Sequence, residues 1–430
     1  MGAGRVPVAQ HRVVLLGGGY VTLHAYAGLM RRAGRAVRRG EVQVVVISTD
    51  DAHSFHGFTG EVLAGMLPFE RTRTPLAEAM PFAHIVLGRA LSVDPQRRVV
   101  AYELLDEPGE RVIDFDELVV GTGGREPAAT VPGLAEHGFT LRAPGDIAVL
   151  AERVRAAVDR TAEATTTGSV VVAGGGLAGV EIAAAIADLG GDRVSVEIVH
   201  SGAGLLPDLR AQQPGLARRA EHELDRLGVR VRLGVRLASV TPEGAILSDG
   251  SFIRAETVIG TIGQRPVQVP GLGDHRDLRG RLVTRPDLSV TDGVWAAGDG
   301  ACVAHVRTGA PVPANALWAI KGGAHVGRNI ARSLDGRRTR AFTYRGLGQA
   351  ASFGFGRSVA DLYGVPLTGW VAWIMRLAFF LRFMPSRRTA AHVVADFARV
   401  ARASDPRAAT TPGAERPVTR PEPAVELAAS

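Results

Sequence analysis

A strand-like apolar run that ends in three consecutive glycines occurs twice in this chain. The runs at residues 13–16 and 170–173 lead into Gly17-Gly18-Gly19 and Gly174-Gly175-Gly176. A strand that turns through glycines into a helix brings backbone N–H groups against a pyrophosphate, at the positive end of the helix dipole. One such turn is weak evidence, because glycine after a buried strand is often only a tight turn. The repetition predicts two dinucleotide sites.

The segments that follow the two glycine runs are also repeated. Residues 87–95 recur, with one insertion, as residues 233–242, and residues 113–123 recur as 253–263. The repeat predicts a helix-rich unit, then a small antiparallel meander, then an apolar strand that returns to a glycine. We therefore expect an α/β fold with two Rossmann-like dinucleotide-binding domains.

The order of the glycine-containing segments resembles that of flavoproteins with two dinucleotide-binding domains. These segments are residues 17–19, 119–124, 174–181 and 294–299. Within that superfamily the chain is most similar to type II NADH:quinone oxidoreductases. His53-Ser54-Phe55, followed by residues 61–65, resembles their segment after the second strand, and an apolar segment near the C-terminus stands where their membrane anchor does. The resemblance extends from residue 11 to about residue 400.

The resemblance implies a discontinuous first domain with the second inserted in it. The FAD-binding domain is expected at 10–144 and 281–366, and the NAD(P)H-binding domain at 145–280. Membrane-associated helices are expected at 367–404. Residues 405–430 are rich in Pro, Ala, Thr and Glu, a composition that cannot bury a core and predicts disorder.

FAD would be held mainly by the first glycine turn and by two later turns. The resemblance implies that Asp299 hydrogen-bonds the ribityl chain. Thr22 stands at the third fingerprint position, where glycine or alanine allows close packing of helix and strand. Ser48 stands where an acid is expected to bind the ribose, so we assign that role to Asp50, with a solvated turn as the alternative. The full predicted FAD set is Gly17, Gly18, Gly19, Tyr20, Asp50, Thr122, Gly123, Gly298 and Asp299.

The second site has a complete G-x-G-x-x-G fingerprint. Its predicted residues are Gly174, Gly176, Gly179, His200, Thr261 and Gly263. His200 ends the next strand, where NAD-specific relatives carry an acid. Without that carboxylate a 2′-phosphate is no longer repelled, and an imidazolium suits a phosphate. The sequence therefore predicts the use of both NADH and NADPH.

Two residues are candidates for catalytic roles. Glu181 corresponds to the family's glutamate near the nicotinamide, where it orients the carboxamide or handles a proton; an exposed helix acid is the alternative. Quinone-reducing members carry a Gln-Gln pair where this chain has Ile320 and Lys321. Lys321 can hydrogen-bond a quinone carbonyl or a reduced flavin oxygen. Trp318 either stacks on a ring or fills the core.

Cysteine content and charge exclude several classes of function. The chain has one cysteine, Cys302, so a dithiol beside the flavin is excluded and no metal cluster is implied. Lys321 is the only lysine among 50 basic residues, and the net charge is +7. We expect the arginines to be scattered among the 43 acids, which argues against a nucleic-acid partner, whereas a basic balance favours an anionic lipid surface. No secretory signal is recognised at residues 1–10, so we expect a cytoplasmic body.

The apolar segment at residues 370–384 is too short to cross a bilayer. As a helix it covers about 22 Å, and the hydrocarbon core is about 30 Å thick. We expect it to lie on the membrane, with Arg376 and Arg382 reaching lipid phosphates and a second helix near 390–404. A buried core helix or a homodimer interface is the alternative.

Together these features imply a FAD-dependent NAD(P)H dehydrogenase that passes electrons to a membrane quinone. We expect it at the inner face of the cell membrane. One alternative is a soluble NAD(P)H-dependent flavin oxidoreductase that acts on a small metabolite or a protein acceptor. Another is a flavoprotein with degenerate sites, retained as a redox sensor.

Overall fold

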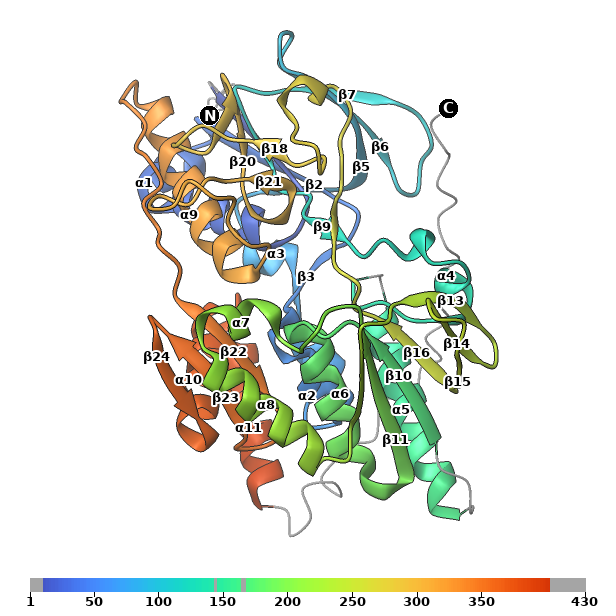
Figure 1. Ribbon diagram of the computed structural model, residues 1–430. Helices are drawn as coiled ribbons and strands as arrows, with labels where there is room; N and C mark the ends of the chain where they lie inside the picture. Colours follow the sequence, from blue (N-terminus) through green and yellow to red (C-terminus); the bar gives the residue numbers. More distant parts are fainter. Residues whose placement is uncertain (1–10, 143–144, 164–167, 403–430) are drawn as a thin grey trace. The chain divides into compact units, whose positions relative to one another are not determined.

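The computed structural model describes residues 11–142, 145–163 and 168–402, which form two compact units (Figure 1). Unit 1 comprises the chain up to Ser54, Arg73–Arg125 and Gln264–Gly346. Unit 2 comprises Phe55–Thr72, Glu126–Gly263 and the chain from Leu347. The changeovers at 125/126 and 263/264 differ from the domain limits expected at 144/145 and 280/281. The tail expected to be disordered, 405–430, lies outside the described residues.

An eight-stranded sheet forms the centre of unit 1, in the order β19-β20-β8-β1-β2-β5-β6-β7. Strands β20, β8, β1, β2 and β5 run parallel, and the mostly apolar sequences of the first four suit burial on both faces. Strands β5, β6 and β7 form the predicted antiparallel meander. The strands are β1 (His11–Leu16), β2 (Val42–Ser48), β5 (His84–Asp94), β6 (Val99–Leu104), β7 (Arg111–Asp114), β8 (Glu117–Val120), β19 (Ser289–Thr291) and β20 (Val294–Ala296).

Two long helices of unit 1, α1 (Tyr20–Arg38) and α9 (Ala316–Leu334), pack against each other through glycines. A Cβ atom at Gly28 would lie 2.6 Å from the carbonyl oxygen of Ala324, and one at Gly327 would lie 1.9 Å from that of Ala25. The backbones therefore approach more closely than any side chain allows. The smaller elements of unit 1 are α3 (Leu76–Ala79), β3 (Ala52–Ser54) with β4 (Arg73–Pro75), β9 (Gly124–Arg125) with β17 (Arg265–Pro266), and β18 (Leu282–Val283) with β21 (Ala301–Cys302).

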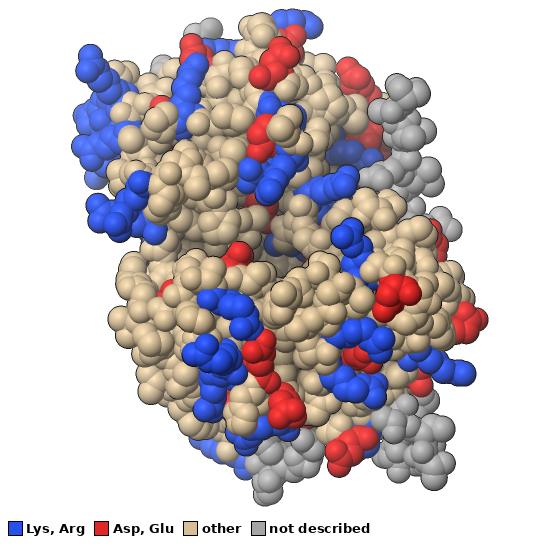
Figure 2. Space-filling view, in the orientation of Figure 1, with Lys and Arg blue, Asp and Glu red and all other residues tan. Residues whose placement is uncertain are grey.

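The outer sides of α1 and α9 carry a dense group of arginines, visible at the upper left of Figure 2. We had expected basic residues to be scattered among acids over the whole chain. That expectation is wrong for this part of unit 1, because the fold brings two arginine-rich stretches, at 31–39 and 328–340, to adjacent helix ends.

Unit 2 repeats the plan of unit 1 with a four-stranded parallel sheet in the order β12-β11-β10-β16. A second antiparallel meander, β13-β14-β15, follows it. This confirms the α/β fold with two Rossmann-like domains. The elements are β10 (Gly168–Ala173), β11 (Val194–His200), β12 (Arg230–Leu233), β13 (Leu237–Thr241), β14 (Gly244–Leu247), β15 (Phe252–Arg254), β16 (Thr257–Gly260), α4 (Leu134–His137), α5 (Asp146–Glu163), α6 (Leu177–Gly190), α7 (Pro207–Gln212) and α8 (Pro214–Arg226).

The C-terminal helices belong to the core of unit 2. The ring centroids of Trp373 and Phe397 lie 5.4 Å apart, and those of Phe58 and Phe380 lie 5.3 Å apart. Among the described residues, none of the helices combines the length and apolar character needed to cross a bilayer. The elements here are α2 (Thr59–Leu63), β22 (Gly348–Ser352), β23 (Ser358–Leu362), β24 (Val365–Thr368), α10 (Gly369–Phe383) and α11 (Arg387–Arg402).

The packing of α1 against α9 predicts opposite effects for two substitutions in the same helix. Gly28→Ala should destabilise the protein by about 1–3 kcal/mol, because the added methyl group meets backbone atoms that cannot move aside. Gly34→Ala should stabilise it by up to about 1 kcal/mol, because only the flexible ends of Met30 and Arg38 lie near the added atom. Chemical denaturation of both variants measures the difference; equal effects would contradict the close approach.

Candidate functional site

The glycine turn of unit 1 has a backbone conformation and a close contact that only glycine allows. Gly17 has φ +95°, and a Cβ atom there would lie 2.8 Å from the carbonyl oxygen of Gly121. Helix α1 begins at Tyr20, with Gly19 as its N-cap and no side-chain cap. Its first N–H groups therefore face the turn, as an anion-binding helix terminus requires.

The structure explains how Thr22 is tolerated at the third fingerprint position. Thr22 is fully buried and its hydroxyl donates a hydrogen bond to the carbonyl oxygen of Gly19 at 3.0 Å. A Cβ atom at Gly121 would lie only 2.6 Å from the Thr22 methyl group. The absent side chain of Gly121 thus makes room for the threonine, and helix and strand still pack closely.

Asp299 lies beside the same cradle. It follows β20 in a short 3₁₀ turn, Gly298–Gly300, and its Cβ lies 3.5 Å from the position that a Cβ of Gly124 would take. A Cβ at Gly123 would meet nothing within 4 Å. The Thr122 hydroxyl donates to the carbonyl oxygen of Val267 at 2.9 Å, which fixes this turn. Bare backbone, a helix terminus and a carboxylate fit a dinucleotide with a polyol chain.

The carboxylate of Asp50, predicted to bind the ribose, is already paired with an arginine. Arg73 Nη2 lies 2.7 Å from Asp50 Oδ1 and 3.1 Å from Asp51 Oδ1. Ser48 is buried, and its hydroxyl donates to the backbone carbonyl of Asp50 at 2.8 Å. Ser48 therefore shapes the turn, and Asp50 and Asp51 are the two acids that follow β2, both in contact with Arg73.

His53, used in the sequence only to align a motif, supports the glycine turn. Its Nδ1–H donates to the carbonyl oxygen of Gly18 at 3.1 Å, and its ring lies edge-on to Tyr20 at 4.7 Å. Burial lowers the pKa of His53 to about 4. The imidazole is therefore neutral, and it holds both Gly18 and Tyr20 of the predicted FAD set.

The second glycine turn, in unit 2, matches the fingerprint in its geometry. Gly174 has φ +127°, and a Cβ there would lie 2.3 Å from the carbonyl oxygen of Thr261. A Cβ at Gly179 would lie 1.9 Å from the carbonyl oxygen of Gly174. The Thr261 hydroxyl donates to the carbonyl oxygen of Ala173 at 3.0 Å. Gly176 and Gly263 leave open space beside the turn.

His200 supports this turn and does not present a cation to it. Its Nδ1 accepts a hydrogen bond from the backbone N–H of Gly175 at 3.1 Å. Burial lowers its pKa, against the effect of a hydrogen bond to the Gly204 backbone, so the ring is neutral at pH 7. The imidazolium expected from the sequence is therefore wrong. Arg210 lies close by, but it pairs with Glu221.

Glu181 takes part in a buried group of charges that the sequence did not reveal. Arg376 Nη2, from α10, lies 3.0 Å from Glu181 Oε1 on α6. Arg376 Nη1 lies 2.5 Å from Glu61 Oε1 on α2. The backbone N–H of Ser352 donates to Glu181 Oε1 at 2.9 Å, and Arg376 also donates to the carbonyl oxygen of Gly57 at 2.9 Å.

Burial of this group raises the pKa of Glu181. The side chains of Arg376 and Glu61 are 4% and 5% exposed, whereas that of Glu181 is 22% exposed and lines a narrow cavity. Burial raises the pKa of Glu181, Arg376 lowers it and Glu61 raises it, with a net upward shift. Arg376 was expected to reach lipid phosphates, and this expectation is wrong. Its one signal in the sequence was a charged residue inside an apolar run.

The remaining candidates lie in unit 1. Lys321 is exposed on the second turn of α9, and its neighbour Ile320 is 3% exposed. Trp318 is buried in the core, with its ring centroid 4.7 Å from that of Tyr344, so core filling is confirmed. Burial raises the pKa of Cys302, which therefore remains a thiol at pH 7.

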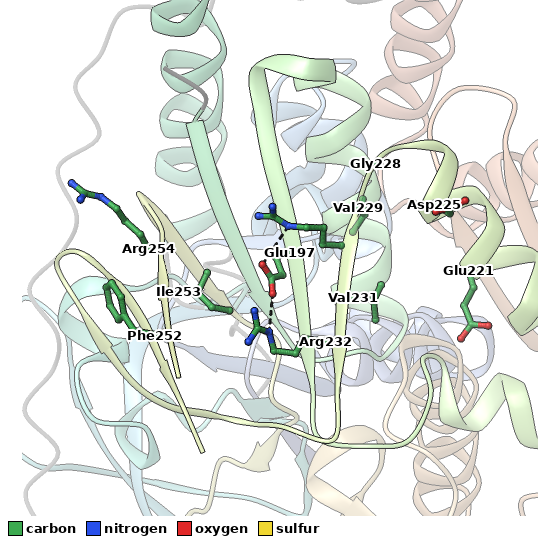
Figure 3. A pocket seen from close by; sticks show the side chains of 11 residues that line it. Glu197, Glu221, Asp225, Gly228, Val229, Val231, Arg232, Phe252, Ile253 and Arg254 are labelled. Atoms are coloured by element: carbon green, nitrogen blue, oxygen red, sulfur yellow. Dashed lines mark hydrogen bonds and ion pairs between the residues drawn. The ribbon is translucent and has the colours of Figure 1, made fainter. Parts of the chain in front are cut away.

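A pocket of about 920 Å³ lies at the edge of the unit 2 sheet (Figure 3). Two of its arginines share one carboxylate: Glu197 lies 2.9 Å from Arg232 and 3.5 Å from Arg230. Figure 3 shows Phe252 and Arg254 on one side and Glu221 and Asp225 on the other. Ligands of parallel sheets bind beyond the carboxyl ends of the strands. This pocket lies at the start of β12, so we do not assign a cofactor to it.

The buried imidazole of His53 predicts a loss of stability in acid. The stability that its lowered pKa contributes is fully present above pH 6.5 and is lost as the pH falls towards 4, because unfolding then takes up a proton. The loss should reach about 3 kcal/mol. His53→Asn keeps a donor for the Gly18 carbonyl but cannot titrate, so urea unfolding of this variant should show a smaller decline. Parallel declines in the two proteins would contradict the assignment.

Comparison with known proteins identifies the family. The chain is 26% identical over 396 residues to demethylphylloquinone reductase NdbB of Synechocystis sp., covering 88% of this chain and 93% of that protein. It is 24% identical over 391 residues to type II NADH:quinone oxidoreductase of Staphylococcus aureus, covering 85% and 93%. NDH2 from Plasmodium falciparum, solved in complex with NADH, has the same fold, with a TM-score of 0.80 at 12% identity, covering 93% and 99%. The pyridine nucleotide-disulphide oxidoreductase family matches residues 11–323, and this chain belongs to that family.

Proposed function

We propose that this protein is a FAD-dependent NAD(P)H dehydrogenase that passes electrons to a membrane quinone. The observation that carries the proposal is the buried Glu181–Arg376–Glu61 group, because Glu181 lies on the helix that begins at the second glycine turn. One cysteine leaves no dithiol to accept the electrons. The names of the Synechocystis and Staphylococcus relatives, both quinone reductases, support the same reaction.

Unit 1 would hold FAD. The amides after Gly17 and Gly19 would bind the pyrophosphate, Asp299 the ribityl hydroxyls, and Asp50 the adenosine ribose. When bound, FAD supplies hydride acceptance from NAD(P)H and electron release to the acceptor. The chain's own part is orientation: Tyr20 and Gly18 are fixed by His53.

Unit 2 would hold NAD(P)H at its glycine turn. Gly174 and Gly179 allow close approach of the backbone, and Thr261 keeps that turn in place. Residues 200–206, at and after the end of β11, contain no acid, and Arg210, which lies near them, pairs with Glu221. We therefore propose that a 2′-hydroxyl and a 2′-phosphate are both accepted.

Glu181 would deliver the proton that quinone reduction needs. NAD(P)H, a proton and a quinone give NAD(P)⁺ and a quinol, so one proton has to be supplied. The raised pKa of Glu181 favours its protonated form, and its side chain is partly exposed where it lines the narrow cavity. Arg376 and the N–H of Ser352 position the carboxyl group.

The acceptor would approach from a membrane. Trp370, Val371 and Ile374 on α10 are each more than half exposed, and their spacing places them on one side of the helix. Such an apolar face suits the headgroup region of a bilayer. We propose peripheral attachment at the inner face of the cell membrane, with Lys321 hydrogen-bonding a quinone carbonyl. A homodimer remains a prediction.

Glu181→Gln should separate quinone reduction from proton-free electron transfer. Ferricyanide takes electrons without a proton, so its reduction by NADH should be nearly unchanged, whereas quinone turnover should fall about 10²-fold or more. In the wild type quinone turnover should decline as the pH rises through the raised pKa of Glu181, because the donor form is lost. This decline should be absent in the variant.

Glu61→Gln provides the matched control for that experiment. It removes the other carboxylate that contacts Arg376 and keeps the proposed donor, but it also lowers the pKa of Glu181, because Glu61 raises that pKa. The decline of quinone turnover should therefore begin at a lower pH than in the wild type, and the two variants are compared below that decline. It should retain much more quinone turnover than Glu181→Gln. Equal losses with quinone and ferricyanide in Glu181→Gln would show that Glu181 acts on hydride transfer instead.

The absence of an acid at position 200 predicts weak discrimination between NADH and NADPH. Their kcat/KM values should differ by no more than about tenfold, or about 1.4 kcal/mol. His200→Glu should shift the ratio toward NADH by at least about tenfold, because a carboxylate accepts from the 2′-hydroxyl and repels the phosphate. His200→Gln controls for loss of the imidazole. If both variants shift the ratio equally, charge is not the cause.

A further inference from the structure

We propose that the arginine-rich ends of α1 and α9 in unit 1 form a second membrane-contact surface, which binds the phosphates of anionic phospholipids. This surface, called here the arginine surface, is separate in sequence from the apolar face of α10. The choice of a membrane as its partner rests on the proposed function, because a quinone reductase meets its acceptor at a bilayer.

The arginines of the first helix stand on its exposed side at its C-terminal end. Helix α1 is amphipathic, and its apolar side is buried against the sheet and against α9. The basic residues are all exposed to solvent: Arg31, Arg32, Arg35, Arg38 and Arg39. Arg38 also lies over the ring of Phe82, which is 49% exposed, at 5.5 Å. A cation beside an exposed aromatic ring suits the boundary of headgroups and acyl chains.

The second group follows on α9 and the loop after it. Its members are partly or fully exposed: Arg328, Arg332, Arg337, Arg338 and Arg340. The two groups are brought together by the glycine contacts between α1 and α9. Burial and the positive charges of Arg31 and Arg32 lower the pKa of Arg328, and burial together with Arg340, Arg32 and Arg337 lowers that of Arg332. The guanidinium groups of both helices therefore repel one another across the contact.

The two stretches themselves contain little negative charge, and two acids from other segments approach the second one: Asp287 accepts a hydrogen bond from the Thr339 hydroxyl at 2.7 Å, and Glu117 is hydrogen-bonded with Ser333. Residues 28–41 and 328–340 contain ten arginines and two acids, Glu41 and Asp335. This local surplus of eight positive charges exceeds the net charge of +7 of the whole chain. Glu41 pairs with Arg39 at 2.8 Å, and Asp335 approaches Arg337 only to 3.9 Å.

A layer of phosphates would relieve this repulsion. Guanidinium groups bind phosphate oxygens in a bidentate manner, and an anionic leaflet offers many phosphates on one plane. Residues 28–41 and 328–340 contain no exposed large apolar or aromatic side chain, and Phe82 beside Arg38 is a single exposed ring. A stacking platform for nucleic-acid bases is therefore not formed by these stretches, which favours lipid over single-stranded nucleic acid.

The test uses the full-length protein and two kinds of vesicle, pure phosphatidylcholine and phosphatidylcholine with phosphatidylglycerol. Wild-type protein should partition onto the anionic vesicles at least about tenfold more strongly at 0.1 M salt. The difference should largely vanish at 1 M salt, where the Debye length is about 3 Å. The quadruple variant Arg31→Gln, Arg32→Gln, Arg337→Gln, Arg338→Gln should lose this difference and keep its binding to neutral vesicles.

A matched variant removes four exposed arginines from other parts of unit 1: Arg97→Gln, Arg111→Gln, Arg285→Gln and Arg307→Gln. It has the same net charge as the first variant and should retain the preference for anionic vesicles. Retention of the preference in the first variant, or an equal loss in both, overturns the proposal. Binding of duplex DNA that depends on the arginine surface, without any vesicle preference, overturns the lipid assignment.

The apolar face of α10 tests the proposed function independently of the arginine surface. The double variant Val371→Ser, Ile374→Ser on α10 should weaken binding to neutral vesicles. Because neither residue is charged, this loss should be the same at low and high salt. If neutral vesicles are bound equally by that variant, or if the protein reduces no quinone, the proposed function fails. The inference would still be supported if the protein kept a salt-sensitive preference for anionic vesicles and lost that preference in the quadruple arginine variant.

Discussion

Close approach of backbone to backbone, made possible by missing side chains, is the constraint on which the rest of this structure depends. Gly17 touches the strand-end turn at Gly121, and Gly174 touches the equivalent turn at Thr261. Each contact places a helix terminus against the end of a parallel strand, where a pyrophosphate can be bound. Any Cβ atom at Gly17 or Gly174 would force the turn open. Both cofactor sites therefore depend on glycine, which has no side chain to block these contacts.

The same constraint acts away from the cofactors. Gly28 and Gly327 bring α1 and α9 into direct backbone contact, and the helix ends then carry their arginines side by side. The backbone contact fixes the spacing of the two helix ends, although the exposed side chains can still move. The repulsion among guanidinium groups is thus built into the packing of unit 1, and an external anion is the means by which it is relieved.

Unit 2 depends on a buried charge as well as on glycine. Arg376 connects α10 to α2 and α6 through two carboxylates, so the C-terminal helix is joined to the nucleotide-binding helix by ion pairs in a site with little water. Removing one partner of such a group leaves an uncompensated buried charge, at a cost of about 3–5 kcal/mol. The C-terminal segment therefore serves the proposed catalytic carboxyl group directly, in addition to presenting an apolar face.

The sequence by itself determined the duplicated α/β fold and both glycine turns, because these features depend on local residue order: strand, glycine, helix. It also predicted a helix over the apolar segment 370–384, which the structure has at Gly369–Phe383, and it left core filling as one of two interpretations of Trp318. Only the tertiary structure decided that Arg376 meets Glu61 and Glu181, that His200 is neutral, and that arginines far apart in the chain gather on one surface. Pairing, burial and pKa depend on which segments the fold brings together, and a linear pattern of residues does not encode those distances.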